Sequence, residues 1–270
     1  MKTKKVIWMC LAVLTFTVII CHDGFTAGGT GNVKQLGKQV YVWSFNEGQG
    51  KETKDSNAGI VGKFIGDIKW AKGASGKAGD FALEFSGKAG SAQYVEVTHC
   101  KEVDIDEQIT MSAWIYPDPL PVGGQENKYT IIIKRYYFQL EPADGKASPI
   151  AYYFYQAQPE QYYLSDAKVE AKKWSHVALV WDGVEATFYV NGKKSNKVNH
   201  KGPGESSATA LKFGGEDAAC CPRFFQGRID DITIANYALS ENEINAQVES
   251  LAVSSQGKLP VLWSALKAVY

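Results

Sequence analysis

The sequence predicts an all-β protein, a two-sheet antiparallel β-sandwich of jelly-roll type with one short helix near its C-terminus. Three observations predict this fold. Short runs of alternating or aromatic-rich residues recur along the chain, with turn residues between them. The 26 glycines and 14 tyrosines favour strands and tight turns over helices. Strands and helices do not alternate as in α/β proteins, and neither a GxGxxG motif nor a P-loop is present.

Residues 1–27 are predicted to be a signal peptide. Three lysines lie within Met1–Lys5, and the following run Ile7–Cys21 carries no charge, as in the first two regions of an export signal. This run is shorter than the roughly 20 apolar residues of a membrane span, so we expect no span in the mature chain. Cleavage after Ala27 or Gly29, lipidation at Cys21 and a retained anchor are the alternatives. The protein is expected to be secreted, or to lie at the cell surface or in the periplasm.

The domain itself is expected over residues 39–252, after a polar, Gly-rich lead-in at 28–38 and before a linker and short tail at 253–270. Alternation and aromatic content predict strands at Val40–Phe45, Ile60–Phe64, Ile68–Ala71, Phe81–Phe85, Tyr94–Thr98, Ile109–Tyr116, Tyr129–Lys134, Tyr137–Leu140, Ile150–Gln156, Gln161–Leu164, Ser175–Asp182, Ala186–Val190, Lys193–Lys197, Ala210–Phe213 and Gly227–Ala235.

Two local signals are especially direct. Asn191-Gly192 separates two of the predicted strands, and both residues tolerate the positive φ values of a type I′ hairpin turn. Ser240 and Glu243 form an S-x-x-E capping box, which predicts that a helix begins here.

Four motifs occur in order along the predicted domain. They are Trp43-x-Phe45-x-Glu47-Gly48, Ile109-Thr110-Met111-Ser112-Ala113-Trp114-Ile115, Trp174-x-His176-Val177-Ala178 and Gly227-x-Ile229-Asp230-Asp231-Ile232. With these motifs the chain resembles the laminin-G-like jelly-roll domains of the concanavalin-A-like lectin/glucanase superfamily. The resemblance covers roughly Val40 to Leu251 and implies the sandwich fold. It does not specify the function, because one fold hosts many activities.

An acidic stretch offers the sharpest enzymatic hypothesis. Glu102, Asp104 and Glu107 match the E-x-D-x-x-E pattern of the laminarinase and lichenase branch of this superfamily, in which carboxylates of one strand serve as nucleophile, helper and acid/base. Here the stretch falls in the connection before the predicted strand Ile109–Tyr116. We therefore interpret it as a solvated acidic loop, and the sequence leans against an enzyme.

The closing strand carries a change in side-chain parity. Phe225, Gly227 and Ile229 share one parity, whereas Ile232 and Ile234 share the other. The inward face therefore switches across Asp230–Asp231, which predicts a β-bulge and at least one carboxylate near the core.

A buried carboxylate needs hydrogen bonds or a cation. The opening and closing strands of a jelly roll commonly lie close together, so Asp55 is expected to meet Asp230. The candidate ligands for a structural Ca²⁺ are Glu47, Asp55, Asp230 and Asp231, as the resemblance also implies. In the alternative interpretation, Asp230 caps backbone N–H groups and binds no metal.

Three cysteines follow the predicted signal: Cys100, Cys220 and Cys221. An exported chain meets an oxidising compartment, and adjacent cysteines rarely bridge each other. We therefore expect Cys100 to pair with Cys220 or Cys221.

Residues 129–163 contain eight of the 14 tyrosines. On the predicted strand Ile150–Gln156, Tyr152 and Phe154 face one way and Tyr153 and Tyr155 the other, so one set is expected to fill the core. Aromatic rings can stack on sugar C–H faces and their hydroxyls can bond sugar hydroxyls. The candidate ligand contacts are Tyr136, Tyr153, Tyr155 and Tyr162. An outward ladder that only stabilises the sheet is the alternative.

The balance of charged residues indicates which classes of binding partner to expect. The chain has 29 basic and 29 acidic residues and no basic stripe, which argues against a nucleic acid. We expect an exported, non-catalytic module that recognises carbohydrate or a glycoprotein surface. The alternatives are a structural or adhesive surface protein and a glycoside hydrolase built on Glu102, Asp104 and Glu107.

Overall fold

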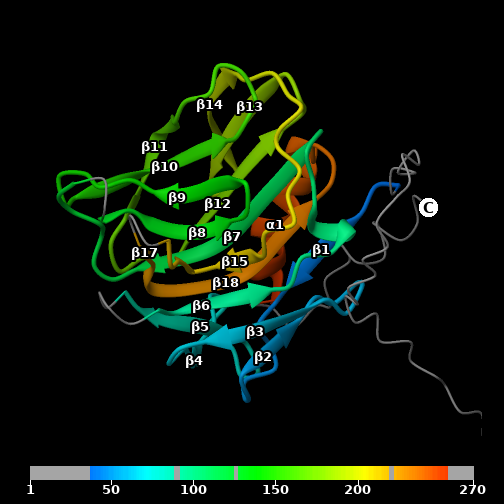
Figure 1. The fold of residues 1–270 in the computed structure, drawn as a ribbon. Coiled ribbons are helices and arrows are strands. Elements are labelled where there is room, and N and C mark those ends of the chain that lie inside the picture. The colour runs from blue at the N-terminus through cyan, green and yellow to red at the C-terminus, as the bar shows by residue number, and fades with distance from the viewer. Residues whose placement is uncertain (1–36, 88–91, 125–126, 219–221, 255–270) are drawn as a thin grey trace, which may run out of the picture.

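The predicted fold class is confirmed by a computed structural model, which describes residues 37–87, 92–124, 127–218 and 222–254 (Figure 1). Two antiparallel sheets pack face to face and one helix follows the last strand. The predicted signal peptide and the C-terminal tail lie outside the described residues. Within them, no helix is long and apolar enough to cross a membrane.

The first sheet, sheet A, contains the opening and closing strands of the domain. Its order is β14 (Lys193–Asn199), β13 (Glu185–Val190), β12 (Ser175–Trp181), β7 (Ile109–Pro117), β18 (Gln226–Ala235), β5 (Phe81–Ser86) and β4 (Lys69–Lys72), and β1 (Val40–Trp43) also pairs with β18. Both β5 and β1 lie along one edge of β18, the first before the bulge and the second after it.

The second sheet, sheet B, contains the tyrosine-rich segment. Its order is β11 (Tyr163–Glu170), β10 (Ala147–Phe154), β9 (Tyr136–Leu140), β8 (Tyr129–Ile133), β15 (Leu211–Phe213), β6 (Tyr94–Val97), β3 (Val61–Ile65) and β2 (Glu52–Lys54). A two-stranded hairpin of β16 (Gly215–Glu216) and β17 (Arg223–Phe224) packs against β8.

The core lies between the two sheets and follows from period-2 alternation. Phe138, Tyr152 and Phe154 of sheet B and Leu179 and Trp181 of sheet A are all fully buried in it. Phe154 and Trp181 make the contact across the sandwich, with ring centroids 4.8 Å apart. Because neighbouring side chains in a strand point to opposite faces, Tyr153 is carried to the outer face of sheet B.

Several local predictions are confirmed. The register of β18 against β7 shifts between Asp230 and Thr233, which is the bulge expected from the parity switch. Asn191 and Gly192 adopt φ of 50° and 76° in the β13–β14 turn. Ser240 donates its backbone N–H to Glu243 at 2.7 Å and caps the Glu243 N–H at 3.3 Å, at the start of α1 (Glu241–Ser254).

Other boundaries differ from the predictions for identifiable reasons. The predicted strand Gln161–Leu164 begins before β11 (Tyr163–Glu170) and overlaps only its first two residues, and the inward residues Ser165 and Val169 continue the alternation to Glu170. The short strands β2, β16 and β17 were not predicted, because two or three residues carry too little pattern.

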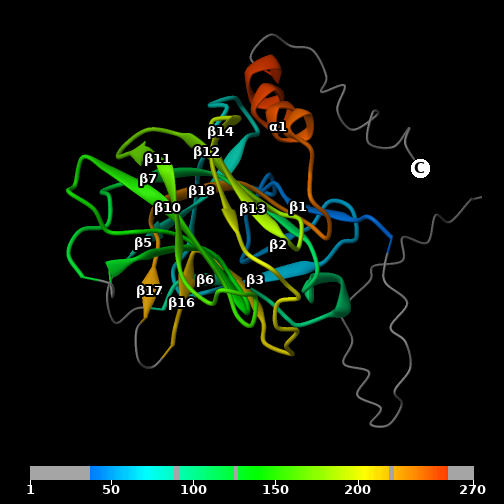
Figure 2. The same cartoon turned by 90° about the horizontal axis from the view of Figure 1, so that it is seen from above.

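Helix α1 covers part of the outer face of sheet A (Figure 2). Its residue Ile244 is buried against Ala178 and Val180 of β12 and Tyr189 of β13. Polar contacts accompany this packing: the Gln247 side chain lies 3.1 Å from Nε2 of the buried His176 and accepts the Ser112 hydroxyl at 2.8 Å.

We expect the protein to lose stability below about pH 6.5 because of His176. Burial lowers the pKa of His176 from 6.5 to about 4, opposed by its bond to Gln247. The unfolded chain therefore binds this proton first, and stability falls as the pH drops from about 6.5 to 4, by about 3 kcal/mol in total at 1.36 kcal/mol per pH unit. Urea unfolding across this range should show the loss in the wild type, and His176→Gln should flatten it. Equal pH slopes for the two proteins would refute the assignment.

Candidate functional site

Four tyrosine rings gather on the outer face of sheet B. They belong to Tyr137 of β9, Tyr153 of β10, and Tyr155 and Tyr162 of the β10–β11 connection. The ring centroids of Tyr153 lie 4.8 Å from Tyr155, 4.9 Å from Tyr162 and 6.0 Å from Tyr137. Tyr162 is the most open, with 39% of its surface exposed. We call this cluster the tyrosine face.

Three of the four predicted ligand contacts lie here, and one does not. Tyr136 is 1% exposed, and its ring packs at 5.2 Å against Phe154 in the core. The prediction for Tyr136 placed it on the wrong face, because β9 begins at Tyr136 and its alternation points Tyr137 outward instead. The sequence does indicate this, because Tyr136 has the same parity as the apolar residues Phe138 and Leu140, which point into the core.

Basic side chains support three of the rings. The Lys128 ammonium lies 3.7 Å from the ring centroid of Tyr162, and the guanidinium carbons of Arg135 and Arg223 lie 4.0 Å and 5.5 Å from the centroids of Tyr155 and Tyr137. Arg223 comes from the β16–β17 hairpin, about 60 residues further along the chain than Tyr162. Such contacts hold the rings in place.

A layer of buried polar side chains lies on the same outer face. Thr130 of β8 and Gln139 of β9 are register partners and are fully buried. Gln139 donates its amide to Glu141 at 3.0 Å. Among the described residues, Thr130 Oγ1 and Gln139 Oε1 have no hydrogen-bond partner, and neither do Arg223 Nε and Glu216 Oε2. Such atoms are rare in proteins, and a ligand can satisfy them.

Two phenols of the tyrosine face, those of Tyr137 and Tyr153, stay protonated at neutral pH. Burial and the bond to Tyr155 raise the pKa of Tyr137, and burial and the bond to Glu160 raise that of Tyr153. Tyr137 donates to Glu216 at 3.2 Å and Tyr153 donates to Glu160. Each phenol is therefore a neutral group able to donate or accept a hydrogen bond.

The acidic stretch does not form a catalytic strand. Glu102 lies in the short 3-10 helix η1 (Lys101–Val103), and Asp104 and Glu107 follow in the loop before β7. The Asp104 carboxylate accepts the Ser207 N–H at 3.0 Å and lies 3.5 Å from the buried ammonium of Lys134. Asp104 therefore ties this loop to sheet B.

Two of the predicted metal ligands are already occupied by backbone groups. Asp55 accepts N–H groups of Val42 at 2.5 Å and Asn57 at 3.1 Å, and Glu47 accepts the Lys54 N–H at 2.8 Å. The expected meeting of Asp55 with Asp230 does not occur, because Asp55 instead closes the turn after β2 and bonds β1, while Asp230 faces a different loop.

Asp230 is fully buried at the bulge of β18 and faces the loop 73–80. It accepts the Ala74 N–H at 2.8 Å and its neighbour's N–H, that of Asp231, also at 2.8 Å. Burial and repulsion from Asp231 raise the pKa of Asp230, and burial and repulsion from Asp80 raise that of Asp231. Asp80 was missed in the sequence because only this loop brings it near β18. Within the described ranges, no three His, Cys, Asp or Glu side chains are arranged as a metal centre.

Only one of the cysteines of the predicted disulfide lies within the described residues. Cys100 is half-buried against the core, whereas Cys220 and Cys221 lie outside the described residues. Cys100 follows the Val97 end of β6, while β16 lies beyond the opposite end, where Phe213 of β15 pairs with Val95. This register weighs against the pairing, which stays a prediction.

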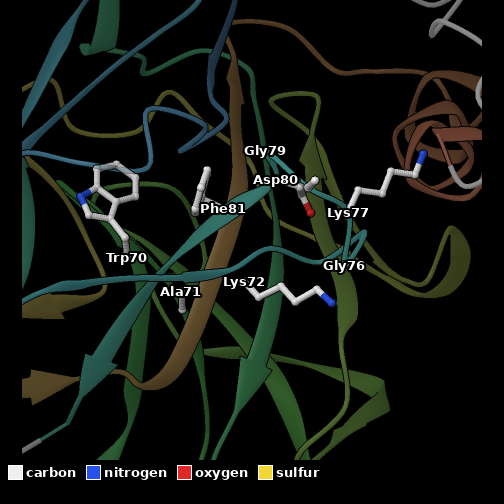
Figure 3. Close-up of a pocket in the computed structure, with 9 residues that line it drawn as sticks. Trp70, Ala71, Lys72, Gly76, Lys77, Gly79, Asp80 and Phe81 are labelled. Atoms are coloured by element: carbon white, nitrogen blue, oxygen red, sulfur yellow. The ribbon is translucent and has the colours of Figure 1, made fainter.

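A shallow groove of about 490 Å³ lies beside the β4–β5 hairpin, away from the tyrosine face. Figure 3 shows the indole of Trp70 at one end and the ammonium groups of Lys72 and Lys77 toward the other. Three glycines, Gly76, Gly79 and the nearby Gly73, line or border it. The groove is wide open and presents few convergent polar groups, so it is a weaker candidate than the tyrosine face.

Comparison with known proteins places the fold. A family model described as the concanavalin A-like lectin/glucanases superfamily matches residues 89–245, which is more than half of the chain. The chain belongs to this superfamily. Members share the sandwich described above, and no curated protein matches the sequence.

Solved structures with the superfamily fold include several binding domains. Domain 4 of AbnA, a GH43 extracellular arabinanase from Geobacillus stearothermophilus solved with arabinotriose, has a TM-score of 0.57 at 18% identity, covering 77% of this chain and 97% of that one. The binding domain of Paraclostridial Mosquitocidal Protein 1 has a TM-score of 0.55 at 14% identity, covering 78% and 51%. The binding domain of Botulinum Neurotoxin DC in complex with SialylT has a TM-score of 0.53 at 15% identity, covering 79% of this chain and 51% of that one. The chain thus spans about half the length of the two toxin domains.

Proposed function

We propose that this protein is a non-catalytic module that binds carbohydrate on the tyrosine face. The observation that carries the proposal is the gathering of four tyrosine rings over polar atoms that lack partners within the described residues. Rings stack on the C–H faces of sugars, and the polar atoms and neutral phenols match sugar hydroxyls. The arabinanase domain solved with arabinotriose and the toxin domain solved with SialylT support carbohydrate as the ligand class.

The proposal includes export through residues 1–27, which would place the module where extracellular glycans are met. Hydrolysis is the competing function. Incubation with β-glucans followed by a reducing-sugar assay separates the two, because a binding module releases no sugar.

Removing a ring of the tyrosine face should weaken glycan binding without unfolding the protein. A glycan array first identifies a ligand, and calorimetry then compares Tyr153→Ala and Tyr162→Ala with the wild type. We expect a loss on the order of 1 kcal/mol or more, which is at least a several-fold weaker Kd.

Tyr116→Ala is the matched control for this experiment, because Tyr116 is a half-buried tyrosine of sheet A that packs on Trp174 at 5.5 Å. The control should bind as the wild type does. Normal binding by both tyrosine-face variants would refute the site. Binding to other copies of the chain or to cells, with no glycan bound, would favour an adhesive protein instead.

A structural Ca²⁺ remains part of the proposal at Asp230 and Asp231, and Asp80 would have to move toward them to join the site, since no three such side chains of the described residues are arranged as a metal centre. Burial and repulsion between carboxylates raise the pKa values of Asp230 and Asp231, because ionising them there is costly, and a bound cation would offset that cost. The carboxylates must turn from their backbone partners to share the ion.

Calcium should raise the melting temperature and a chelator should lower it, since an ion that binds only the folded state adds about 2.7 kcal/mol at 100 times its Kd. Asp230→Asn should remove most of this response. Glu47→Gln should keep it, because Glu47 is engaged with Thr53 and Lys54. A melting curve of the chelated wild type that calcium leaves unchanged would contradict the site.

A further inference from the structure

The charges around the tyrosine face are paired one to one. Lys128 lies 2.8 Å from Glu141, Arg223 lies 3.6 Å from Glu216, and Arg135 bonds Glu205. These pairs are sheltered, since the side chains of Lys128 and Arg223 are only 2% and 12% exposed. Each basic group that supports a ring is therefore already neutralised by a carboxylate.

A fourth carboxylate makes the net charge around the tyrosine face negative. Glu160 accepts the Tyr153 hydroxyl and has no basic partner among the described residues. Three cations and four carboxylates thus surround the four rings. A carboxylate or sulfate on a glycan needs a free cation, best a guanidinium with both N–H edges available. Arg135 and Arg223 each lie against a carboxylate, so an acidic ligand would have to share the guanidinium with Glu205 or Glu216.

The polar atoms without partners call for hydroxyl groups instead. Gln139 Oε1 and Glu216 Oε2 accept hydrogen bonds, Arg223 Nε donates one, and Thr130 Oγ1 can do either. A sugar hydroxyl both donates and accepts, so it can satisfy atoms of both kinds while adding no charge.

We propose that the tyrosine face selects uncharged glycans over acidic ones, an inference that rests on the proposed function. Selectivity then comes from the carboxylates, which repel an acidic ligand and occupy the arginines, as much as from stacking on the tyrosines.

The test uses an array printed in matched pairs, in which each neutral oligosaccharide stands beside its sialylated or sulfated counterpart, for example lactose beside 3′-sialyllactose. The wild type should bind the neutral member at least about tenfold more tightly. Affinity for that member should change less than about twofold between roughly 50 and 500 mM salt, because screening acts on charged ligands.

Removing the carboxylate partner of one arginine should reduce the preference for neutral over acidic glycans. Glu216→Gln leaves Arg223 without its carboxylate and should raise affinity for the acidic member by about fivefold or more. Glu205→Gln frees Arg135 and serves as a second variant should the first fail to fold. The matched control Glu185→Gln breaks the exposed 2.8 Å pair with Lys197 on sheet A and should leave both affinities unchanged.

The outcomes distinguish the two proposals. If the wild type binds no glycan, the proposed function fails and the selectivity fails with it. If it binds acidic members more tightly, with a steep loss of affinity in salt, the module stands and the selectivity is overturned. An unchanged preference in folded Glu216→Gln and Glu205→Gln also overturns it.

Discussion

Replacing Phe154 by alanine should lower the free energy of unfolding by about 3–5 kcal/mol, the usual cost of truncating a buried aromatic side chain. Phe154 is fully buried between the sheets, where its ring contacts Trp181 at 4.8 Å and Tyr136 at 5.2 Å. Gly204 packs directly against this ring, since a Cβ there would lie 2.5 Å from Phe154. The site is therefore filled on all sides, and alanine leaves a cavity. Urea unfolding measures the loss.

Its neighbour Tyr153 provides the contrast, since the two residues share one strand and one chemistry. Tyr153→Ala removes a half-buried outer ring and should cost far less stability, while its glycan binding is reduced. Tyr152→Ala should behave like Phe154→Ala, because Tyr152 is also fully buried in the core. If all four residues 152–155 gave alike melting curves on truncation, the assignment of faces on β10 would be wrong.

Replacing Lys134 by methionine should also cost about 3–5 kcal/mol, because it leaves the partly buried Asp104 without its cation and two carbonyl oxygens without their donor. The Lys134 ammonium donates to the carbonyl oxygens of Ser207 and Thr209 at 2.5 and 2.7 Å and lies 3.5 Å from Asp104. Its side chain is 2% exposed. Methionine keeps most of the apolar stem, so the loss reports the charge and its hydrogen bonds.

Lys197→Met is the matched control, because Lys197 forms an exposed pair with Glu185 that is worth less than about 1 kcal/mol. The double variant Lys134→Met with Asp104→Asn should be more stable than the sum of the two single losses predicts, since the two residues interact. Additive losses, or a Lys134→Met loss no larger than that of the control, would show that the ammonium does not hold this loop.

The fold could be predicted from the sequence because strands, turns and helix starts depend on patterns of only a few neighbouring residues. Alternation along β10 and β12 separates inward from outward side chains whatever the strands pair with. The parity switch at Asp230–Asp231 forced a bulge, and Asn191-Gly192 and the Ser240–Glu243 box specified a turn and a helix start through backbone geometry alone.

The candidate site followed from the sequence only in part. Tyrosine content and alternation located Tyr153, Tyr155 and Tyr162, but not Tyr137, whose place depended on where β9 begins. The sequence also did not predict the contacts of Asp104 and Asp80, whose partners are distant in the chain. Asp104 pairs with Lys134, and the loop 73–80 brings Asp80 beside Asp230.

By itself, then, the sequence determined the all-β class, the two side-chain faces of β10, the parity switch in β18, and the superfamily. Only the tertiary structure decided which side chains meet across strands far apart in the chain. Arg223 reaches Tyr137 because the β16–β17 hairpin packs against β8, and Glu205 reaches Arg135 across 70 residues. The physical reason is that side-chain parity is a property of one strand, whereas the pairing of charges depends on strand order and register, which the whole core selects together.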